Sequence, residues 1–271
     1  MEGAGSMVTI FTASLLTALT ILIAVGGLLL VRKRVPAEAL KGHHDVADPM
    51  LSIIGTLFAV LLGFMVANAM QRFEEARVTT QQEASAVANV YRVATGLPEP
   101  TRSKLMHAAK TYVEDVIQDE WPKLAVKISS EKAWHSYNEL WNICLHYSPT
   151  GNGDNNLHAS VMSYMGTVGD SRRMRVGALH NGLPQVLWVV LLAGGCATVA
   201  FTYFFGIENL RLQILMTSMV SLAICLNMFL LFSFDDPFSG DVRISPACFQ
   251  SVLDNFEAIE HPGLPFLNED K

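Results

Sequence analysis

The sequence has few charged residues and few cysteines. Only 16% of its 271 residues are Asp, Glu, Lys or Arg, whereas about a quarter of the residues of a soluble domain are charged. Four cysteines are too few for disulfide bonds to hold together a chain of 271 residues. A net charge of −6 at pH 7 also gives no basic surface for phosphate contacts. The composition excludes a purely soluble enzyme and a disulfide scaffold, and it predicts no nucleic-acid partner.

Motifs of catalysis are also missing. The sequence contains no phosphate-binding loop, no dinucleotide fingerprint, no H-E-x-x-H, no C-x-x-C and no G-x-S-x-G. His43 and His44 are sensible zinc ligands, but adjacent histidines on one loop seldom close a four-ligand site, so a solvated polar loop is favoured. We therefore expect no enzyme and no bound cofactor.

Four long stretches contain no charged residue at all. They are residues 8–31, 51–70, 183–205 and 212–233. A helix needs about 20 apolar residues to cross a hydrocarbon core about 30 Å thick, and each stretch reaches that length. The sequence therefore predicts an all-α integral membrane protein with four transmembrane helices.

The charged residues lie mainly in one long block between the second and third stretches. Spacings of three and four from Phe73 to Ala94 predict that span two continues as a helix until Gly96. Thr101 and Ser130 are the predicted N-caps of two further helices. We therefore expect a transmembrane hairpin at 1–70, a helical extramembrane domain at 71–182, a second hairpin at 183–233 and an extramembrane tail at 234–271.

The distribution of Lys and Arg favours an N-terminus outside the membrane. No basic residue precedes span one, whereas Arg32, Lys33, Arg34 and Lys41 follow it, and cytoplasmic loops carry an excess of such residues. Five arginines that flank spans two and three on the other side contest this orientation, namely Arg72, Arg77, Arg172, Arg173 and Arg175. In either orientation, one side of the membrane carries nearly all the extramembrane residues.

Span two has a face of small residues. Gly55, Ala59, Gly63 and Ala67 recur every four residues, so another helix can approach closely there. Packing within one subunit and packing around a pore explain this face equally well. In a pore, the remaining surface would supply a hydrophobic constriction flanked by polar groups. The candidate pore-lining residues are Phe58, Leu62, Met65 and Asn68.

Carboxylates follow spans two and four, whose ends must lie on the same side of the membrane. They are Glu74, Glu75, Asp235, Asp236 and Asp241. Around a central axis, such residues would attract cations or bind a divalent ion. Arg72, Arg77 and Arg243 lie among them, so interfacial salt bridges are the favoured alternative.

Several short motifs resemble those of the bacterial bestrophin-like membrane proteins, a family of unknown function. They are GTLFAVLLGF at 55–64, FEEA at 73–76, GLP at 96–98, DEWP at 119–122, LP at 183–184 with Trp188, and PFSG at 237–240 before SP at 245–246. The resemblance covers about residues 50–250. It implies a bacterial inner-membrane protein, remotely similar to bestrophins, which are homopentameric and mainly anion-selective channels.

The resemblance also implies roles for individual residues. By position, Phe58, Leu62 and Met65 match the neck-lining helix of bestrophins, and Asp235, Asp236 and Asp241 occupy the place of their acidic calcium clasp. The clasp's continuous acidic run is missing here, so calcium gating is not expected. Bestrophins also keep their large domain in the cytosol, which conflicts with an N-terminus outside.

These observations predict an oligomeric, passive ion channel in the lipid bilayer, with inorganic ions as its cargo and a pentamer by analogy. An anion preference follows from the resemblance alone. The alternative is a membrane-anchored sensor or assembly protein whose helical domain binds a partner or ligand. Its interface would be Trp134, Tyr137 and Trp141, although large aromatics more often pack inside a domain.

Overall fold

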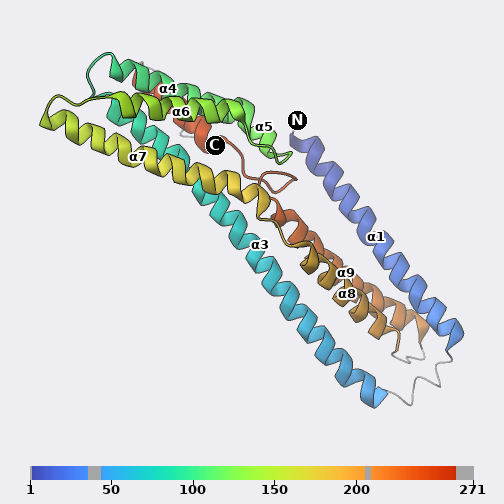
Figure 1. The fold of residues 1–271 in the computed structure, drawn as a ribbon. Coiled ribbons are helices and arrows are strands. Elements are labelled where there is room, and N and C mark those ends of the chain that lie inside the picture. Colours follow the sequence, from blue (N-terminus) through green and yellow to red (C-terminus); the bar gives the residue numbers. More distant parts are fainter. Residues whose placement is uncertain (1, 36–43, 205–208, 261–271) are drawn as a thin grey trace. The chain divides into compact units, whose positions relative to one another are not determined.

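The structure, a computed structural model, describes residues 2–35, 44–204 and 209–260, and these residues form helices and no strand. The predicted all-α class is therefore confirmed. Four of the helices are long and apolar enough to cross a membrane, so the chain is a multi-pass membrane protein. They are α1 (Glu2–Arg34), α3 (His44–Ala94), α8 (Gln185–Thr202) and α9 (Leu210–Asp235), labelled in Figure 1.

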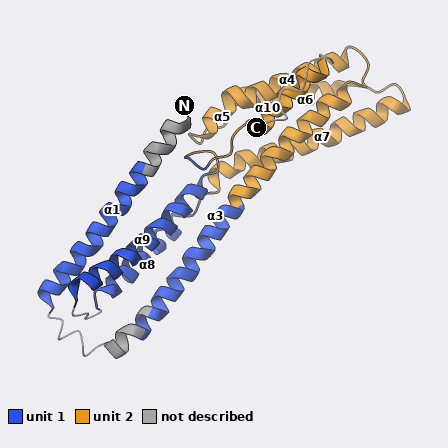
Figure 2. Cartoon of the chain, turned by 180° about the vertical axis from the view of Figure 1, so that it is seen from behind, with its two compact units in different colours: residues 1–71, 182–236, 240–242 blue, residues 72–181, 237–239, 243–271 orange. Residues whose placement is uncertain are grey.

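The chain divides into two compact units, coloured separately in Figure 2. The membrane unit comprises residues 1–71, 182–236 and 240–242, and the helical unit comprises 72–181, 237–239 and 243–271. Helix α3 contributes to both and passes from one to the other between Gln71 and Arg72. The four-part division expected from the sequence concerns the edges of the bilayer and stays a prediction.

The membrane unit is held together by small residues and polar side chains. Helix α1 packs along α9 and α8. A Cβ on Gly27 would lie 2.7 Å from the Tyr203 hydroxyl oxygen, so a larger residue there would displace the Tyr203 side chain. The Oγ1 atoms of Thr202 and Thr217 lie 3.1 Å apart and join α8 to α9. Such contacts are typical of packing between membrane helices.

The helical unit packs five helices around an apolar core. Besides the end of α3, they are α4 (Thr101–Asp115), α6 (Glu131–His146), α7 (Asn152–Gly177) and α10 (Ala247–Glu260). A π-helical turn (Val116–Glu120) and the short α5 (Trp121–Leu124) continue α4, and a 3-10 turn (Ala178–His180) ends α7. The core includes Val87, Tyr112, Leu140, Met165 and Phe249.

The helix boundaries confirm most of the local predictions. Helix α3 continues without a break to Ala94, and the Ser130 hydroxyl caps α6 by accepting a 3.0 Å hydrogen bond from the Ala133 N–H. The prediction for Thr101 was wrong, because Thr101 is already inside α4. The Glu99 carboxylate accepts from the Ser103 N–H at 3.3 Å instead, since its longer side chain reaches the first turn from further back.

Candidate functional site

Three of the four candidate pore-lining residues pack inside the membrane unit. Phe58 and Leu62 are only 7% and 5% exposed, and they form a core with Leu191 and Leu231 of α8 and α9. Met65 is half-buried against the same core. Their role in an assembly stays a prediction, but within one chain these side chains fix the position of α3 against its neighbours.

Phe58 lies in a seat that two glycines of α8 provide. A Cβ on Gly194 would be 2.6 Å from Cδ2 of the Phe58 ring, and one on Gly195 would be 3.6 Å from its Cζ. The ring therefore reaches the backbone of α8 directly. Any larger residue at Gly194 would displace it.

The exposed side of span two carries a different set of residues. Ile53, Leu57, Val60 and Phe64 are 51–68% exposed and recur at spacings of three and four, so they share one face of α3. Asn68, the fourth candidate, is also exposed and continues this face. We call these five residues the outer stripe. The described residues of the membrane unit leave this side of α3 exposed.

The small-residue face of span two is open as well. Apart from the neighbouring backbone of α3 itself, no atom of the described residues lies within 4 Å of the place where a Cβ on Gly55 or Gly63 would be, and Ala59 and Ala67 are exposed. Packing within one chain, the simpler of the two explanations for this face, therefore does not account for its glycines among the described residues. The face is available to lipid or to a helix of another copy.

The candidate acidic residues are divided between the two units. Glu74 and Glu75 belong to the helical unit, whereas Asp235, Asp236 and Asp241 belong to the membrane unit. Their grouping at one pore mouth stays a prediction. Both Oε atoms of Glu74 accept hydrogen bonds from Arg77, at 2.7 and 2.9 Å, and Asp235 Oδ1 accepts from the Leu183 N–H at 2.8 Å.

The contacts of Glu74 and Asp235 have different consequences. The hydrogen bond and charge of Arg77 lower the pKa of Glu74, so this side chain stays ionised at neutral pH but is already paired. Asp235 ties the end of α9 to the residues that precede α8. No group of three or more His, Cys, Asp or Glu residues within the described ranges is placed to hold a metal ion; His43 and the side chain of His44 lie outside these ranges.

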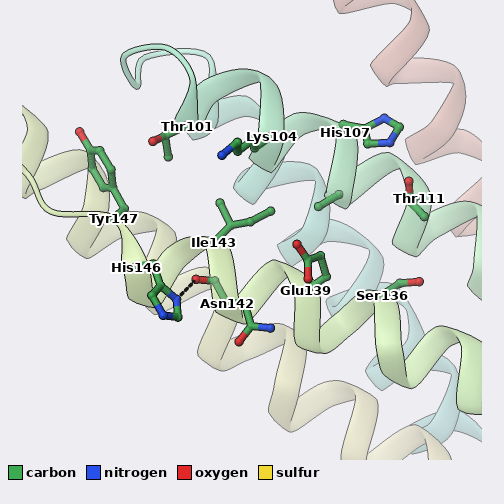
Figure 3. Close-up of a pocket in the computed structure, with 11 residues that line it drawn as sticks. Thr101, Lys104, His107, Thr111, Ser136, Glu139, Asn142, Ile143, His146 and Tyr147 are labelled. Carbon is green, nitrogen blue, oxygen red and sulfur yellow. Dashed lines mark hydrogen bonds between the residues drawn. The ribbon is translucent and has the colours of Figure 1, made fainter.

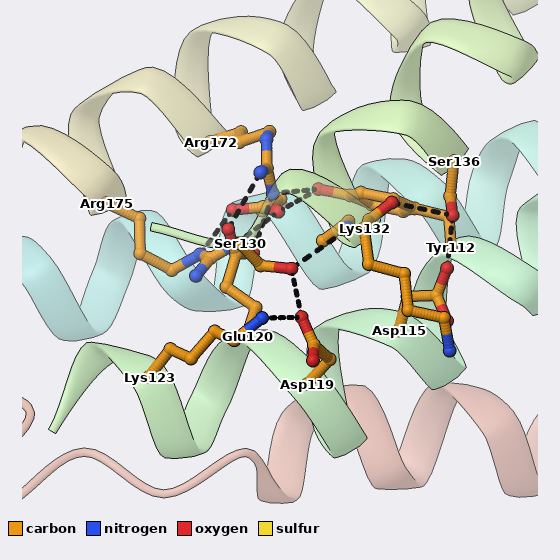
Figure 4. Close-up of polar contacts among 12 residues, drawn as sticks. Tyr112, Asp115, Asp119, Glu120, Lys123, Ser130, Lys132, Ser136, Arg172 and Arg175 are labelled. Carbon is orange, nitrogen blue, oxygen red and sulfur yellow. Dashed lines mark hydrogen bonds and ion pairs between the residues drawn. The ribbon is translucent and has the colours of Figure 1, made fainter. Parts of the chain in front are cut away.

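The helical unit contains a buried ion network that the sequence did not reveal (Figure 4). Arg175 donates from Nε to Glu83 Oε2 at 2.7 Å and from Nη2 to Glu120 Oε2 at 2.8 Å. Arg172 forms two parallel hydrogen bonds to Glu120, at 2.6 and 2.7 Å. The Tyr112 hydroxyl donates to Glu83 Oε1 at 2.5 Å. Two cations thus balance two anions, and all five side chains are buried.

The network depends on local helix geometry and on aromatic neighbours. The wider π-helical turn ends at Glu120, and such single turns shift the side chains that follow relative to a regular helix. Arg172 and Arg175 are three residues apart and so share one face of α7. The Arg175 guanidinium lies 5.4 Å from the Trp121 ring and 5.7 Å from the Phe249 ring. These contacts join α3, the π-helical turn, α5 and α10 to α7 around one buried arginine.

Electrostatics favour the ionised form of Glu120. Burial alone would raise the pKa of Glu120, but the charge of Arg175 and the hydrogen bonds from Arg172 outweigh it, so its pKa is lowered. Burial also raises the pKa of Tyr112 well above its usual range, so its hydroxyl remains a donor. Between them, Glu83 and Glu120 accept hydrogen bonds from both arginines, and the chemistry of the site is therefore structural and not that of a general acid or base.

The aromatic residues of the rival interface are mostly packed. Tyr137 and Trp141 lie against the core of the helical unit, and Trp134 is 52% exposed. A separate groove of about 810 Å³ runs between α4 and α6. Lys104, His107, Glu139 and His146 line it (Figure 3). Its polar lining makes it the helical unit's candidate surface for a ligand or partner.

Comparison with known proteins places the chain in a family. The Bestrophin-like domain matches residues 18–249. The chain belongs to the Bestrophin-like family. The resemblance of its motifs, which covered about residues 50–250, is therefore confirmed. A comparison with curated proteins finds no match.

Solved structures share the fold of this Bestrophin-like chain. Three are variants of a bacterial bestrophin homologue from Klebsiella pneumoniae. Their TM-scores are 0.67, 0.65 and 0.62, at 12%, 13% and 15% sequence identity. The alignments cover 90%, 90% and 93% of this chain and 99% of each of the others. At such low identity the likeness concerns the fold alone.

Proposed function

We propose that this protein is a passive, oligomeric ion channel, without catalytic activity, in a bacterial inner membrane. Its membership of the Bestrophin-like family supports a channel. The observation that carries the proposal is the outer stripe of α3, where Leu57, Phe64 and Asn68 are exposed beside an open small-residue face. Several copies of α3 packed through that face would surround an axis.

This arrangement gives the candidate residues of span two distinct tasks. Phe64 and Leu57 would form a hydrophobic constriction, since rings of apolar side chains can gate a pore by dewetting. Asn68, one turn from Phe64, would supply the polar rim. Phe58, Leu62 and Met65 would act from behind by holding α3 in place.

The permeant species would be a small inorganic ion. The similarity to bestrophins favours an anion, whereas Glu74, Glu75, Asp235, Asp236 and Asp241 would favour cations if they gathered at a mouth. The measured reversal potential in a salt gradient decides between them. A pentamer is proposed by analogy with the family.

The proposed topology has the N-terminus outside. It rests on the basic residues Arg32, Lys33 and Arg34 that follow span one, and it would put the helical unit outside as well. Trypsin added to sealed right-side-out vesicles should then cut within 71–182. Protection of that segment would reverse the orientation.

Flux in proteoliposomes tests the channel. We expect the purified full chain to carry current with a measurable reversal potential. Substituting Phe64→Ala should raise the conductance severalfold, because it widens the apolar constriction. Protein that is inserted and oligomeric but silent in several salts and at several voltages would remove the proposal.

A matched variant distinguishes the outer stripe from the packed face. Val60→Ala and Phe64→Ala both shorten exposed side chains of α3, whereas Phe58→Ala empties a seat inside the unit. If the outer stripe lines the path, the first two variants alter conductance at unchanged stability. Flux that responds only to Phe58, and only together with lost stability, would place the path elsewhere.

The groove between α4 and α6 supports a second candidate function, that of a sensor or assembly protein. Lys104 and Glu139 give it charges of both signs, which suits a polar partner. A photoreactive amino acid at His107 of the full chain should then form one reproducible adduct that Lys104→Glu abolishes. Adduct formation without any ion flux would favour this function over the channel.

A further inference from the structure

The turn between α5 and α6 exposes two large apolar side chains that are two positions apart. Val126 is 65% exposed and Ile128 is 56% exposed, and Lys127, also exposed, lies between them in the sequence. The proposed channel assigns this turn no role, and the turn does not line the groove between α4 and α6. Apolar side chains that cluster at a surface are a feature of sites that contact a protein or a membrane.

Backbone hydrogen bonds fix the conformation of this turn. The Ile128 N–H donates to the Lys123 carbonyl at 3.0 Å, and the Lys127 N–H donates to the Leu124 carbonyl at 3.0 Å. These two bonds form a Schellman motif, which ends a helix and usually places glycine where Lys127 has its φ of +60°. The two apolar side chains are therefore presented by a defined turn.

The turn belongs to the end of the helical unit that is joined to the spans. Leu124, just before it, is fully buried in a small core with Ala76, Leu179, Phe238 and Ile244. Ala76 follows the second uncharged stretch by six residues, Leu179 precedes the third by four, and Phe238 follows the fourth by five. Six residues of helix correspond to about 9 Å. The connections of the chain therefore keep this end of the helical unit close to the membrane surface.

The lysines around the turn favour a lipid surface over another copy of the chain. Lys127 lies between the two apolar side chains, and Lys123 and Lys132 flank the turn, although these two also pair with Asp119 and Asp115. Lysine is depleted in the cores of protein–protein interfaces. At a bilayer surface, in contrast, lysine packs its stem against apolar groups and extends its ammonium group toward the lipid phosphates.

We propose that the turn formed by residues 125–129 docks on the bilayer that the spans cross. Val126 and Ile128 enter the boundary between headgroups and acyl chains, and Lys127 lies beside the lipid phosphates. Because Leu124 shares a core with Ala76 of α3, the docked turn also steadies the part of α3 that follows span two. Docking does not depend on whether the chain conducts ions.

Quenching by a spin-labelled lipid tests the docking in the full chain. A fluorescent amino acid replaces Val126, and the protein is placed in vesicles of phosphatidylcholine and phosphatidylglycerol. A phospholipid with a nitroxide near its headgroup is the quencher. We expect this reporter to be quenched roughly threefold more strongly than the same reporter at Leu145, because only the turn reaches the depth of the nitroxide.

Leu145 is a matched position because it is equally exposed but lies elsewhere in the helical unit. It is 62% exposed and lies near the end of α6. The carbonyl oxygen of the preceding Cys144 lies 2.9 Å from Nε2 of His158, in the second turn of α7. About 30 Å of helix separates His158 from the end of α7, which leads into span three.

Two kinds of variant separate the contributions within the turn. With the reporter at Val126, Ile128→Asp should lower the quenching to the level seen at Leu145, because a carboxylate is repelled from the boundary of an anionic bilayer. Leu145→Asp is the control and should change nothing. Lys127→Gly keeps the turn, since glycine readily adopts a positive φ, and it should lower the quenching only when phosphatidylglycerol is present. An unchanged thermal transition verifies that each variant is folded.

Several results would overturn the proposal. Equal quenching at Val126 and Leu145 would show that the turn has no special contact with lipid. Strong quenching that persists in Ile128→Asp would show that the apolar side chains do not set the depth, and an unaltered response of Lys127→Gly to phosphatidylglycerol would exclude the phosphate contact. A photoreactive amino acid at Ile128 that links two copies of the chain, and no lipid, would show that another copy covers the turn. Selective quenching of a protein that passes no ions would keep the docking and remove only the channel.

Discussion

The two units of this chain solve the same packing problem with opposite chemistry. In the membrane unit, the buried polar side chains within the described ranges are neutral, and they are Thr198, Thr202, Gln213, Thr217 and Ser221. In the helical unit they include fully charged groups, with Arg175 and Glu83 entirely buried. Large exposed apolar side chains show the reverse distribution and lie mostly in the membrane unit.

The difference follows from what surrounds each unit. A charge inside a span has hydrocarbon around it, so membrane helices associate through small residues and hydroxyl groups. The helical unit gains stability by burying apolar surface from water, and it can hold buried charges where opposite charges and hydrogen bonds compensate them. Helix α3 crosses from one regime to the other, with exposed Phe64 before the boundary and buried Glu83 beyond it.

Removing the buried cation of Arg175 should cause the largest loss of stability in the helical unit. Arg175→Met leaves Glu83 and Glu120 buried with less compensation, and we expect a loss of about 3–5 kcal/mol in unfolding free energy. Tryptophan fluorescence, to which Trp121 beside Arg175 contributes, reports the transition. Arg173→Met is the matched control, because Arg173 is exposed and pairs only with Asp170. Similar losses for both variants would contradict a special role of burial.

In the membrane unit, the strongest effect should come from packing and not from charge. Phe58→Ala leaves an empty seat against Gly194, and we expect a loss of roughly 3 kcal/mol. Phe64→Ala, on the exposed outer stripe of the same helix, should leave stability unchanged. Unfolding in mixed detergent micelles measures both. Equal destabilisation would mean that Phe64 is also packed in the unit's folded state.

The dependence of stability on acid should distinguish the two units. The pKa of Glu120 is lower in the folded chain than its ordinary value of 4.5, so the unfolded chain binds more protons in this range. Its contribution to stability is therefore complete above that value and is lost as the pH falls through the folded pKa. Unfolding followed by tryptophan fluorescence should show that the helical unit loses stability on acidification below about pH 4.5. Glu120→Gln should be less stable at pH 7 and less sensitive to acid; an unchanged acid response would exclude this group.

The smallest effect on stability should come from the exposed pair of Glu74 and Arg77. Both side chains are about half exposed, and surface ion pairs of this kind contribute little. Glu74→Gln should leave the thermal transition unchanged within error. If Glu74 lies at a pore mouth, the reversal potential of the channel should nevertheless shift toward anions. A shift in the melting transition without a shift in potential would make Glu74 a structural residue.

Much of the fold followed from simple features of the sequence. The uncharged stretches predicted four spans, and the spacing of three and four beyond Phe73 predicted the continuation of α3 to Ala94, which the structure confirms. The Ser130 cap was also predictable, because a short hydroxyl side chain just before a helix accepts a hydrogen bond from a backbone N–H only three residues further on. The Thr101 cap was not, since Glu99 acts through a longer side chain two residues earlier.

The interior partners could not be predicted in the same way. Glu83 and Arg175 are 92 positions apart and bond side chain to side chain, and nothing local distinguishes Arg175 from the exposed Arg173. The acidic Glu120, a partner of both arginines, is the last residue of the π-helical turn. A balanced set of buried charges depends on which helices meet, and that is a property of the tertiary structure.

The sequence by itself determined that this chain is a helical membrane protein of the Bestrophin-like family, because span length, apolar composition and short motifs are local properties. Only the tertiary structure decided which side of each helix is covered by other helices of the chain. The same helix presents Phe58 to Gly194 and Phe64 to its surroundings, although both are phenylalanines in one apolar run. The reason is that burial depends on neighbours far away in the chain, and a repeat every three or four residues cannot distinguish them.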